Sequence, residues 1–314
     1  MAGSGQINTP ITRTVLGKSL ALDAPLHLWA MDAYKKYDPL YTKMASVRNV
    51  AKGDRVITMQ ATGLGPMPQK AEYVQMVSDG IVEGHQKTVE IVTRGLSVHI
   101  SQETIEDSGR LKQVSIAKLL AKSANDAEEI DTATVVNNGT ATTYYTSADG
   151  LAVFSGSHKN LDGSTYSNLT TGYLAYTVLK SALLAIRKRA DHRSAPIMLS
   201  VSGLWVPPDQ QDKAEEVVFA HGLPNSTDND AIAQSVSSLR GKIMSNPWFT
   251  GTNACMIRCK ESADNQGIVF WRRIPFGVVV EDDKRQGGKI WRGRTRYRVD
   301  VSDPRTLQGF GYSA

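Results

Sequence analysis

The sequence predicts an α+β fold, and three of its segments carry the prediction. Residues 101–137 predict a helix well beyond the ~11 to 12 residues of an average one, with a loose helical period of apolar positions from Arg110 on. Residues 170–219 read as helix, strand and helix, which together form a compact α/β block. Residues 267–314 are rich in β-prone runs. The chain is therefore expected to combine long helices with a β-rich last part.

Size and composition indicate a globular protein. The 314 residues suffice for one large domain or two ordinary ones, and 41% hydrophobic residues leave ample material for a core. The net charge of +5 fits either a solvated surface or a face that meets nucleic acid non-specifically. No run reaches the ~18 to 20 apolar residues of a membrane span, and residues 1–10 do not resemble a signal peptide. We expect a soluble protein made in a cytosol.

The first 50 residues predict an irregular leader. Residues 23–37 can form one short helix, and the rest is polar and similar to a linker. Such an arm has little apolar surface to bury by itself. It is therefore expected to be disordered or to lie against another part of the chain or another subunit.

Residues 54–100 predict a long hairpin. Glycine and proline at 62–68 break the first extended run, and Asp79-Gly80 is a turn signal. Residues 96–100 then alternate apolar and polar positions, as a strand with one buried face does. A hairpin with so little apolar surface is marginal alone and needs a partner surface. That surface is either the hairpin's own domain or a neighbouring subunit.

A helix is predicted over residues 101–137. Ser101 or Thr104 can cap its start. Ser108-Gly109 is expected to interrupt it, and Asn138-Gly139 to end it. This helix is the longest regular element that the sequence predicts.

The α/β block begins with a helix that Thr170 or Thr171 can cap. Its apolar positions recur at intervals of four, three and four and form one buried stripe. They are Leu179, Leu183, Ile186 and Ala190. The basic residues 187–189 suit the negative end of the helix dipole and the solvent, or alternatively contact DNA. A short strand follows and ends at Val206, and residues 207–209 open the next helix.

The last predicted strands carry arginine at every second position. The four arginines are Arg292, Arg294, Arg296 and Arg298. A spacing of two puts their guanidinium groups on one strand face, where like charges repel unless carboxylates or phosphates neutralise them. We expect them either to pair with acidic side chains of neighbouring strands or subunits, or to contact nucleic acid without reading its bases.

The sequence carries no recognisable catalytic site. It lacks the G-x-S-x-G nucleophile elbow, and the glycine-containing stretch 63–68 lacks the lysine and the helix of a phosphate loop. The adjacent carboxylates at 106–107 would not face each other on a helix. His158 could act as a base near Asp149 or Asp162, but no nucleophile accompanies it. We interpret His158 as a hydrogen-bonded loop residue and expect no catalytic residue.

The two cysteines, Cys255 and Cys259, invite a metal or redox interpretation. A structural zinc needs four ligands, and no histidine or further cysteine lies nearby in the sequence. On a strand, positions four apart lie ~13 Å apart, too far for a disulfide. We therefore expect buried free thiols, with no metal site and no cofactor.

Three segments occur in a fixed order before residue 209. Residues 149–158 read D-G-L-A-V-F-S-G-S-H, residues 163–168 read G-S-T-Y-S-N, and residues 204–208 read L-W-V-P-P. This order resembles the major capsid (major head) proteins of tailed bacteriophages, particularly the branch that is similar to the Mu-type head subunit. In that family a helix ending in basic residues, an aspartate (here Asp191) and a strand ending in V-P-P follow the first two segments. Lys159 departs from the pattern, because many relatives carry proline there.

The resemblance implies an HK97-like capsid fold with four parts. They are an N-terminal arm (1–50), an extension loop (51–95), a peripheral domain with a long spine helix and a sheet (96–148 and 262–300), and an axial α/β domain (149–261 and 301–314). In this family the extension loop lies over a neighbouring subunit. Expected inter-subunit contacts are Gly65, Pro66, Arg292, Arg294, Arg296 and Arg298.

The resemblance also implies a function. The chain is expected to be a major capsid protein that assembles into hexamers and pentamers of an icosahedral phage head around double-stranded DNA. Assembly would take place in the host cytoplasm, with scaffold, portal and decoration proteins as further partners and without a membrane. Two alternatives stay open: an encapsulin-like shell that encloses protein cargo, and an α/β enzyme, which the missing site disfavours.

Overall fold

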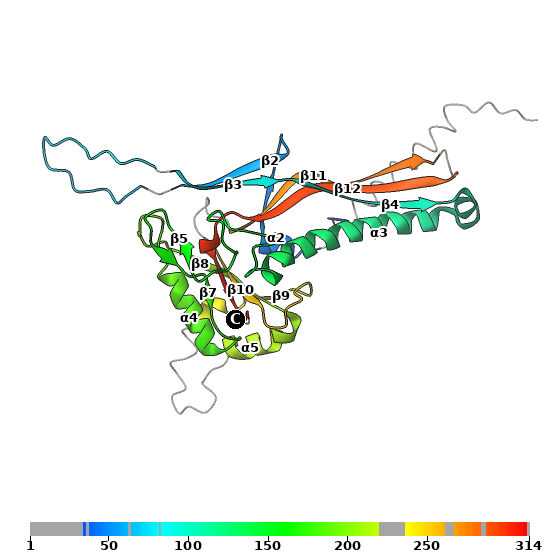
Figure 1. Cartoon of the computed structure of the whole chain (residues 1–314). Coiled ribbons are helices and arrows are strands. Elements are labelled where there is room, and N and C mark those ends of the chain that lie inside the picture. The colour runs from blue at the N-terminus through cyan, green and yellow to red at the C-terminus, as the bar shows by residue number, and fades with distance from the viewer. Residues whose placement is uncertain are drawn as a thin grey trace, which may run out of the picture. The chain divides into compact units, whose positions relative to one another are not determined.

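The computed structural model describes residues 34–35, 38–61, 64–81, 83–219, 236–260, 267–283 and 287–312 (Figure 1), with backbone only at 61, 104–105 and 108–115. Most of the expected N-terminal arm, including most of its short helix, lies outside these residues. The expectation that the arm is irregular is wrong for residues 41–49, which form a short helix and a strand that pairs with residues 269–272. The chain divides into two compact units. The first comprises Met1–Asp38, Val92–Ala127 and Ile274–Tyr297, and the second comprises Pro39–Ile91, Glu128–Arg273 and Arg298–Ala314.

The predicted long helix is present as α3, which runs from Gln102 to Asn137 (Figure 1). It ends where Asn138-Gly139 predicted, but the expected interruption at Ser108-Gly109 is wrong. A glycine inside a helix costs only about 1 kcal/mol relative to alanine, so one such residue does not break a helix of 36 residues. None of the described helices combines the length and the apolarity that crossing a bilayer requires.

The first unit is built from a helix packed on a sheet. Ala117, Leu120 and Ala121 of α3 lie within about one helical turn and are buried. They meet Phe276 and Trp291 of the sheet in one apolar cluster. The apolar positions that predict α3 are not all on this face, because Leu119 and Ile130 are exposed.

The sheet that includes Phe276 and Trp291 has the strand order β1-β11-β12-β4, and its strand β1 and residues 268–273 of β11 are counted with the second unit. Its strands are β1 (Ser46–Asn49), β11 (Ile268–Asp282), β12 (Lys289–Val301) and β4 (Val92–Ile100). β12 pairs antiparallel with β4, with Lys289 opposite Ile100 and Tyr297 opposite Val92. β4 is therefore an edge strand of this sheet.

The second unit contains the predicted α/β block. A five-stranded sheet has the order β7-β13-β10-β8-β9. Its strands are β7 (Leu169–Thr170), β13 (Leu307–Phe310), β10 (Cys255–Lys260), β8 (Ser200–Val206) and β9 (Ile243–Ser245). Helices α4 (Tyr176–Arg187) and α5 (Gln211–Phe219) pack on it, and α2 (Tyr41–Met44) lies earlier in the chain.

Three of the four predicted positions form the buried stripe of α4, but Ala190 lies beyond the helix, which ends at Arg187. Leu179, Leu183 and Ile186 are buried in the main core, together with residues of β8, β10 and β13. The predicted caps at Thr170 or Thr171 are wrong, because the helix begins only at Tyr176 after an extended Ala175. Thr170 is instead part of β7, where pairing with β13 uses its backbone.

Both cysteines are buried free thiols, as predicted. Cys255 and Cys259 lie in β10 and belong to the same core cluster. Burial raises the pKa of each thiol to about 12, so neither is a thiolate near neutral pH.

The second unit contains a hairpin within the predicted range 54–100, but it ends at Glu90, and the strand expected at 96–100 is instead part of β4, which pairs with β12. β2 (Arg55–Ala61) pairs antiparallel with β3 (Glu83–Glu90), and residues 64–81 connect them without regular secondary structure. A small hairpin of β5 (His158–Lys159) and β6 (Thr165–Tyr166) completes the unit.

Candidate subunit-contact surfaces

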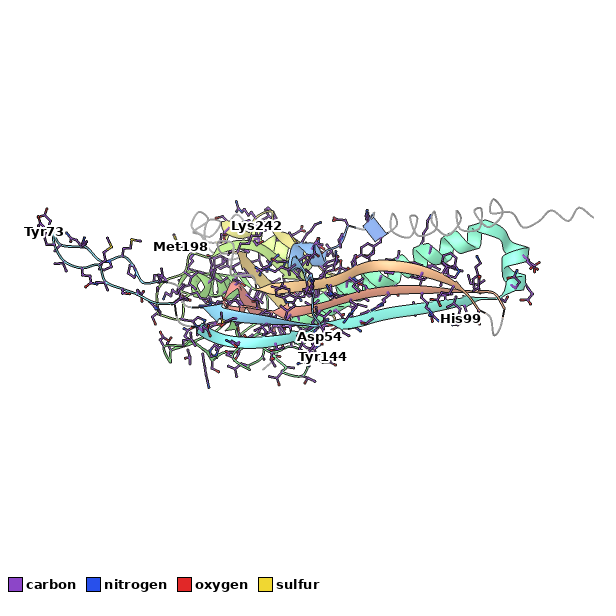
Figure 2. The ribbon with its side chains drawn as sticks, turned by 90° about the horizontal axis from the view of Figure 1, so that it is seen from above. Asp54, Tyr73, His99, Tyr144, Met198 and Lys242 are labelled. Carbon is purple, nitrogen blue, oxygen red and sulfur yellow. The ribbon has the colours of Figure 1, made fainter. Side chains whose placement is uncertain are left out.

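Residues 64–81, which we call the connecting loop, expose many large apolar side chains. The exposed ones are Leu64, Met67, Tyr73, Val74, Met76, Val77 and Ile81. Met67 is 99% exposed, and Tyr73, at the far end of the loop in Figure 2, is fully exposed. Folded monomers rarely present so many apolar groups on one segment, so the connecting loop has the character of a contact surface. Gly65 and Pro66 lie at its start.

Polar contacts close the base of the connecting loop. The backbone N–H of Gly65 donates to Asp79 Oδ2 at 2.8 Å, so the two ends of the loop are joined. Arg193 donates through one nitrogen to Asp79 (2.7 Å) and through another to the carbonyl oxygen of Gly80 (2.5 Å). The hydrogen bond from Arg193, with those from the Gly65 and Gly80 N–H groups, lowers the pKa of Asp79 to about 2. The carboxylate thus stays ionised while it holds the loop.

The arginines of β12 alternate with buried residues, as their spacing predicted. Trp291 and Tyr297 are buried, while Arg292 and Arg294 are exposed. On the arginine face, Val279 of the adjacent β11 is also 57% exposed. This face of the sheet therefore carries both charge and uncovered apolar surface.

The four arginines differ in their partners. Arg292 forms an ion pair with Glu281 of β11 at 2.8 Å, and both side chains are about half exposed. The guanidinium of Arg298 lies over the ring of Tyr145, 5.5 Å from its centre. In the described part of the chain, no carboxylate lies within ion-pairing distance of Arg294 or Arg296. Within one chain, pairing with a carboxylate on a neighbouring strand is seen for Arg292.

Buried hydrogen bonds join the two sequence segments 149–158 and 163–168. His158 Nδ1 lies 2.7 Å from Asp149 Oδ2, and His158 Nε2 lies 3.1 Å from Asn168 Oδ1. Asn168 donates to the carbonyl oxygens of Val153 (2.7 Å) and Pro304 (3.2 Å). Asp149, His158 and Asn168 thus hold neighbouring loops together, and His158 is the hydrogen-bonded loop residue that we expected.

The arrangement matches a known family. The model of the family described as phage capsid protein matches residues 86–308, which is more than two thirds of the chain. The chain belongs to this family. A search of curated proteins finds no match.

Solved structures show the fold of this capsid protein. The capsid of cyanophage P-SCSP1u has a TM-score of 0.55 at 10% identity, with 87% of this chain and 88% of that chain covered. The virus-like particle of Pyrococcus furiosus has a TM-score of 0.52 at 12% identity, with 91% and 98% covered. The holo-SrpI encapsulin complex of Synechococcus elongatus has a TM-score of 0.54 at 9% identity, with 88% and 87% covered. The fold is the α+β, HK97-like capsid fold.

Arg305 is a residue of the capsid protein that sequence reasoning missed. Its guanidinium is 2% exposed, forms two parallel hydrogen bonds with Asp303 (3.0 and 2.9 Å) and reaches Asp191 at 2.5 Å. Burial opposes its charge, but Asp303 and Asp191 outweigh burial and raise its pKa. Asp303 also caps the short helix Pro304–Thr306. The D-P pair at 303–304 is the signal from which that cap could have been predicted.

Arg189 corrects an expectation for the basic triplet at 187–189. Its side chain is buried and donates to the carbonyl oxygens of Arg305 (2.6 Å), Leu307 (3.1 Å) and Ser167 (3.0 Å). It therefore neither caps α4 by charge nor meets solvent or DNA. Arg189 lies just beyond the end of α4, where its backbone N–H donates to the carbonyl oxygen of Ile186 at 3.2 Å.

Among the described residues, no group of three or more His, Cys, Asp or Glu side chains is arranged to hold a metal ion. Asp149 is ionised beside His158, but no serine, threonine or cysteine is hydrogen-bonded to the ring of His158. The buried polar side chains described above, such as His158 and Arg305, form hydrogen bonds between loops of the capsid protein.

Proposed function

We propose that this chain is the major capsid protein of a tailed phage, whose copies form hexamers and pentamers of an icosahedral head around double-stranded DNA. Membership of the phage capsid family supports a role in the shell. The observation that carries the assembly is the connecting loop, which exposes Met67 and Tyr73 almost completely. Apolar surface of this extent is stabilised by burial against a partner.

The four parts of the subunit follow from the same proposal. We assign residues 1–50 to the N-terminal arm, 51–95 to the extension loop, 96–148 and 262–300 to the peripheral domain, and 149–261 and 301–314 to the axial domain. The division of the chain into two compact, discontinuous units supports a two-domain subunit. The connecting loop is the tip of the extension loop.

The contacts between subunits involve both surfaces described above. Gly65 and Pro66 belong to the loop that covers a neighbour, and Arg294 and Arg296 meet carboxylates of a neighbour, because their own chain supplies none within the described residues. Packaged DNA is the alternative partner for these arginines and would bind them through its phosphates.

The chain acts as a structural protein rather than an enzyme, and it resides in the virion. Its shell is assembled in the host cytoplasm, with scaffold, portal and decoration proteins as partners that the family would supply. The structural role is supported by buried polar side chains such as His158 and Asn168, because their hydrogen bonds go to loops of their own chain.

Electron microscopy of the purified protein, alone and with a scaffold from the same phage, tests the proposal. We expect closed shells, and nuclease-protected DNA in particles from infected cells. A protein that stays a small soluble oligomer under every condition, including co-expression with phage assembly factors, would contradict it and favour the α/β enzyme.

An encapsulin-like nanocompartment is the second candidate function. The likeness to the encapsulin of Synechococcus elongatus favours it as an alternative, because the two chains share the fold over most of their length. Small shells that contain protein and no protected nucleic acid would select this candidate.

A further inference from the structure

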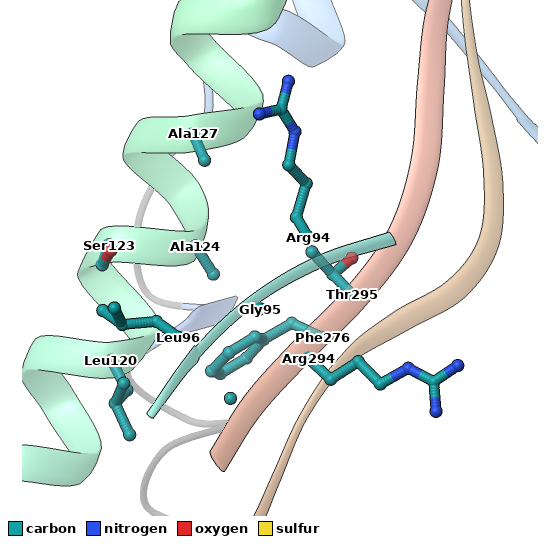
Figure 3. Close-up of a pocket in the computed structure, with 11 residues that line it drawn as sticks. Arg94, Gly95, Leu96, Leu120, Ser123, Ala124, Ala127, Phe276, Arg294 and Thr295 are labelled. Atoms are coloured by element: carbon teal, nitrogen blue, oxygen red, sulfur yellow. The ribbon is translucent and has the colours of Figure 1, made fainter. Parts of the chain in front are cut away.

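The first unit contains an open apolar pocket between helix α3 and strands β4 and β12. Its volume is about 210 Å³, and Figure 3 shows Leu96, Leu120 and Phe276 around it. Gly293 contributes to the space, because a Cβ there would lie 3.0 Å from the Phe276 ring. Ala124 lies on the helix side of the same wall. The cavity therefore exists because Gly293 and Ala124 are small, and larger side chains at these positions would fill it.

The pocket is apolar inside and carries a positive charge at its side. Leu96 is 53% exposed, although its side chain lies beside the apolar wall. Arg94 extends along the pocket towards Ala127 in Figure 3, whereas Arg294 points away from the helix. The hydroxyl of Thr295 is a polar group in the wall. These features fit an aromatic side chain that has a hydroxyl group and a neighbouring carboxylate.

The size of the pocket fits one aromatic ring. A cavity of about 150 Å³ lined by leucine, isoleucine and phenylalanine is large enough to bind benzene. A volume of about 210 Å³ accommodates a tyrosine ring with its hydroxyl. Phe276 supplies a ring against which an aromatic side chain packs in an offset or edge-to-face arrangement.

The connecting loop carries a side chain of this kind. Tyr73 is fully exposed, and its backbone φ of 58° is unusual for a residue other than glycine. Glu72 precedes Tyr73 and is exposed as well. The loop thus presents an aromatic ring and a carboxylate side by side.

We propose that Tyr73 of one subunit inserts into this pocket of a second copy of the chain, where Glu72 faces Arg94. The inference rests on the proposed function, because it assumes that the connecting loop covers a neighbouring subunit. It goes further by naming the anchor, the pocket and the charge pair. A contact between two different surfaces of identical subunits is heterologous, and its repetition closes a ring of subunits when the rotation from one copy to the next closes.

A disulfide between engineered cysteines tests the position of the loop directly. The variant Tyr73→Cys with Ser123→Cys places one thiol on the loop and one at the pocket. Cys255 and Cys259 do not interfere, because they are buried and their pKa is raised to about 12. After mild oxidation of assembled particles, we expect a ladder of covalently linked subunits on non-reducing gels. The control variant Tyr73→Cys with Ser181→Cys, in which the second cysteine is on α4, should give none.

Two outcomes would overturn the inference. One is normal particles without a ladder for the Ser123 pair, and the other is an equal ladder for the Ser181 pair. Particles that form without the ladder leave the proposed function intact. Failure of the unaltered chain to form particles under any condition would instead contradict the proposed function itself.

A second series decides the matter if the cysteine variant does not assemble. Tyr73→Phe should assemble like the parent, whereas Tyr73→Ala should raise the protein concentration needed for assembly at least about tenfold. Ala124→Leu, which fills the pocket from the helix side, should have the same effect while the subunit stays folded by circular dichroism. Tyr144→Ala, at an exposed tyrosine outside the loop, is the control and should assemble normally.

The charge pair has its own reciprocal test. Glu72→Arg and Arg94→Glu should each impair assembly, and the double variant should restore it in part. Parental assembly by both Tyr73→Ala and Ala124→Leu would show that another segment, or no segment, occupies the pocket.

Discussion

The imidazole of His158 and the carboxylate of Asp149 are joined by a hydrogen bond in the interior of the second unit. Their atoms Nδ1 and Oδ2 lie 2.7 Å apart, and the two side chains are 0% and 5% exposed. The backbone N–H groups of Leu151 and Lys159 also donate to Asp149. This carboxylate therefore fixes both ends of the first motif, which begins at residue 149 and ends at residue 158.

Replacing Asp149 by alanine should destabilise the subunit strongly. Removing the carboxylate leaves a buried ring nitrogen of His158 without its hydrogen-bond partner, which costs about 1 to 3 kcal/mol. Chemical denaturation of the soluble subunit at pH 7 measures the loss. Asp209→Ala, at an exposed carboxylate, is the matched control and should change the free energy of unfolding by less than about 0.5 kcal/mol. Equal losses for the two variants would contradict the role of the pair.

Acid should weaken the same contact. Burial acts to raise the pKa of Asp149, but the hydrogen bonds from His158, Leu151 and Lys159 outweigh burial and hold it at about 2. Because the folded-state pKa lies below the ordinary value, the contribution to stability is present above pH ~4 and is lost as the pH falls towards 2. The free energies of unfolding of the parent and of Asp149→Ala should therefore converge in this range.

His192 predicts a second dependence on pH. Its ring lies 6.1 Å from that of His85 in β3, and neither of its nitrogens has a hydrogen-bond partner among the described residues. Burial lowers the pKa of His192, and Arg305 and His85 act in the same direction, while Asp191 and Asp303 oppose them. A lowered folded-state pKa in a base means that the neutral form stabilises the fold. That stability is lost as the pH falls below ~6.5.

The measurement is the change in melting temperature of the subunit between pH 7 and pH 5. His192→Phe keeps a ring in the same place and should make this change smaller than in the parent. His99→Gln serves as the control, because His99 is 58% exposed, and should leave the change as it was. The same pH dependence in the parent and in His192→Phe would show that His192 does not titrate in this range.

The spacing of apolar residues in the sequence predicted those helices whose formation depends mainly on their own residues. The stripe Leu179, Leu183 and Ile186 is a property of helix α4 alone and was confirmed. The existence of α3 was also predicted, but its buried face was not, because Leu119 and Ile130 of the apolar period are exposed. The start of α4 could not be read locally, because pairing of β7 with β13, ~140 residues away in sequence, occupies Thr170 first.

The contacts of the buried arginines could not be predicted from the sequence either, because their partners lie far away along the chain. Arg305 meets Asp191 across 114 residues of sequence, and Arg189 meets the Leu307 carbonyl across 118. Nothing in a linear pattern connects such partners. The connecting loop was expected from its glycine and proline residues, but its closure by Arg193 and Asp79 depends on the same kind of long-range contact.

Deleting residues 63–68 should block shell closure and leave the α/β block folded. The deletion removes Gly65, whose N–H joins the start of the connecting loop to Asp79, and it removes the exposed Met67. The core formed by α4 and the five-stranded sheet contains none of these residues. Electron microscopy scores closure, and far-ultraviolet circular dichroism with a thermal melt scores the fold. Normal particles from the deletion variant would refute the role of the loop.

The arginines of β12 are expected to differ in their importance for assembly, and Arg292 is the control for Arg294 and Arg296. Arg292 already pairs with Glu281, and both side chains are about half exposed, so Arg292→Ala should cost at most about 1 kcal/mol and leave assembly intact. Arg294 and Arg296 have no carboxylate partner among the described residues of their own chain, so a neighbouring subunit is expected to supply one.

If those contacts are desolvated in the shell, Arg294→Ala and Arg296→Ala each leave a buried carboxylate unpaired, at about 3 to 5 kcal/mol per contact. Assembly should then fail even when no DNA is present. If the two arginines face packaged DNA instead, empty shells of both variants should form normally, and only genome packaging should suffer, with DNA binding that weakens as salt increases. We expect the first result, because the strand that carries these arginines also buries Trp291 and Tyr297 and is part of a packed sheet. Counting empty shells of the three variants under a microscope decides between the two partners.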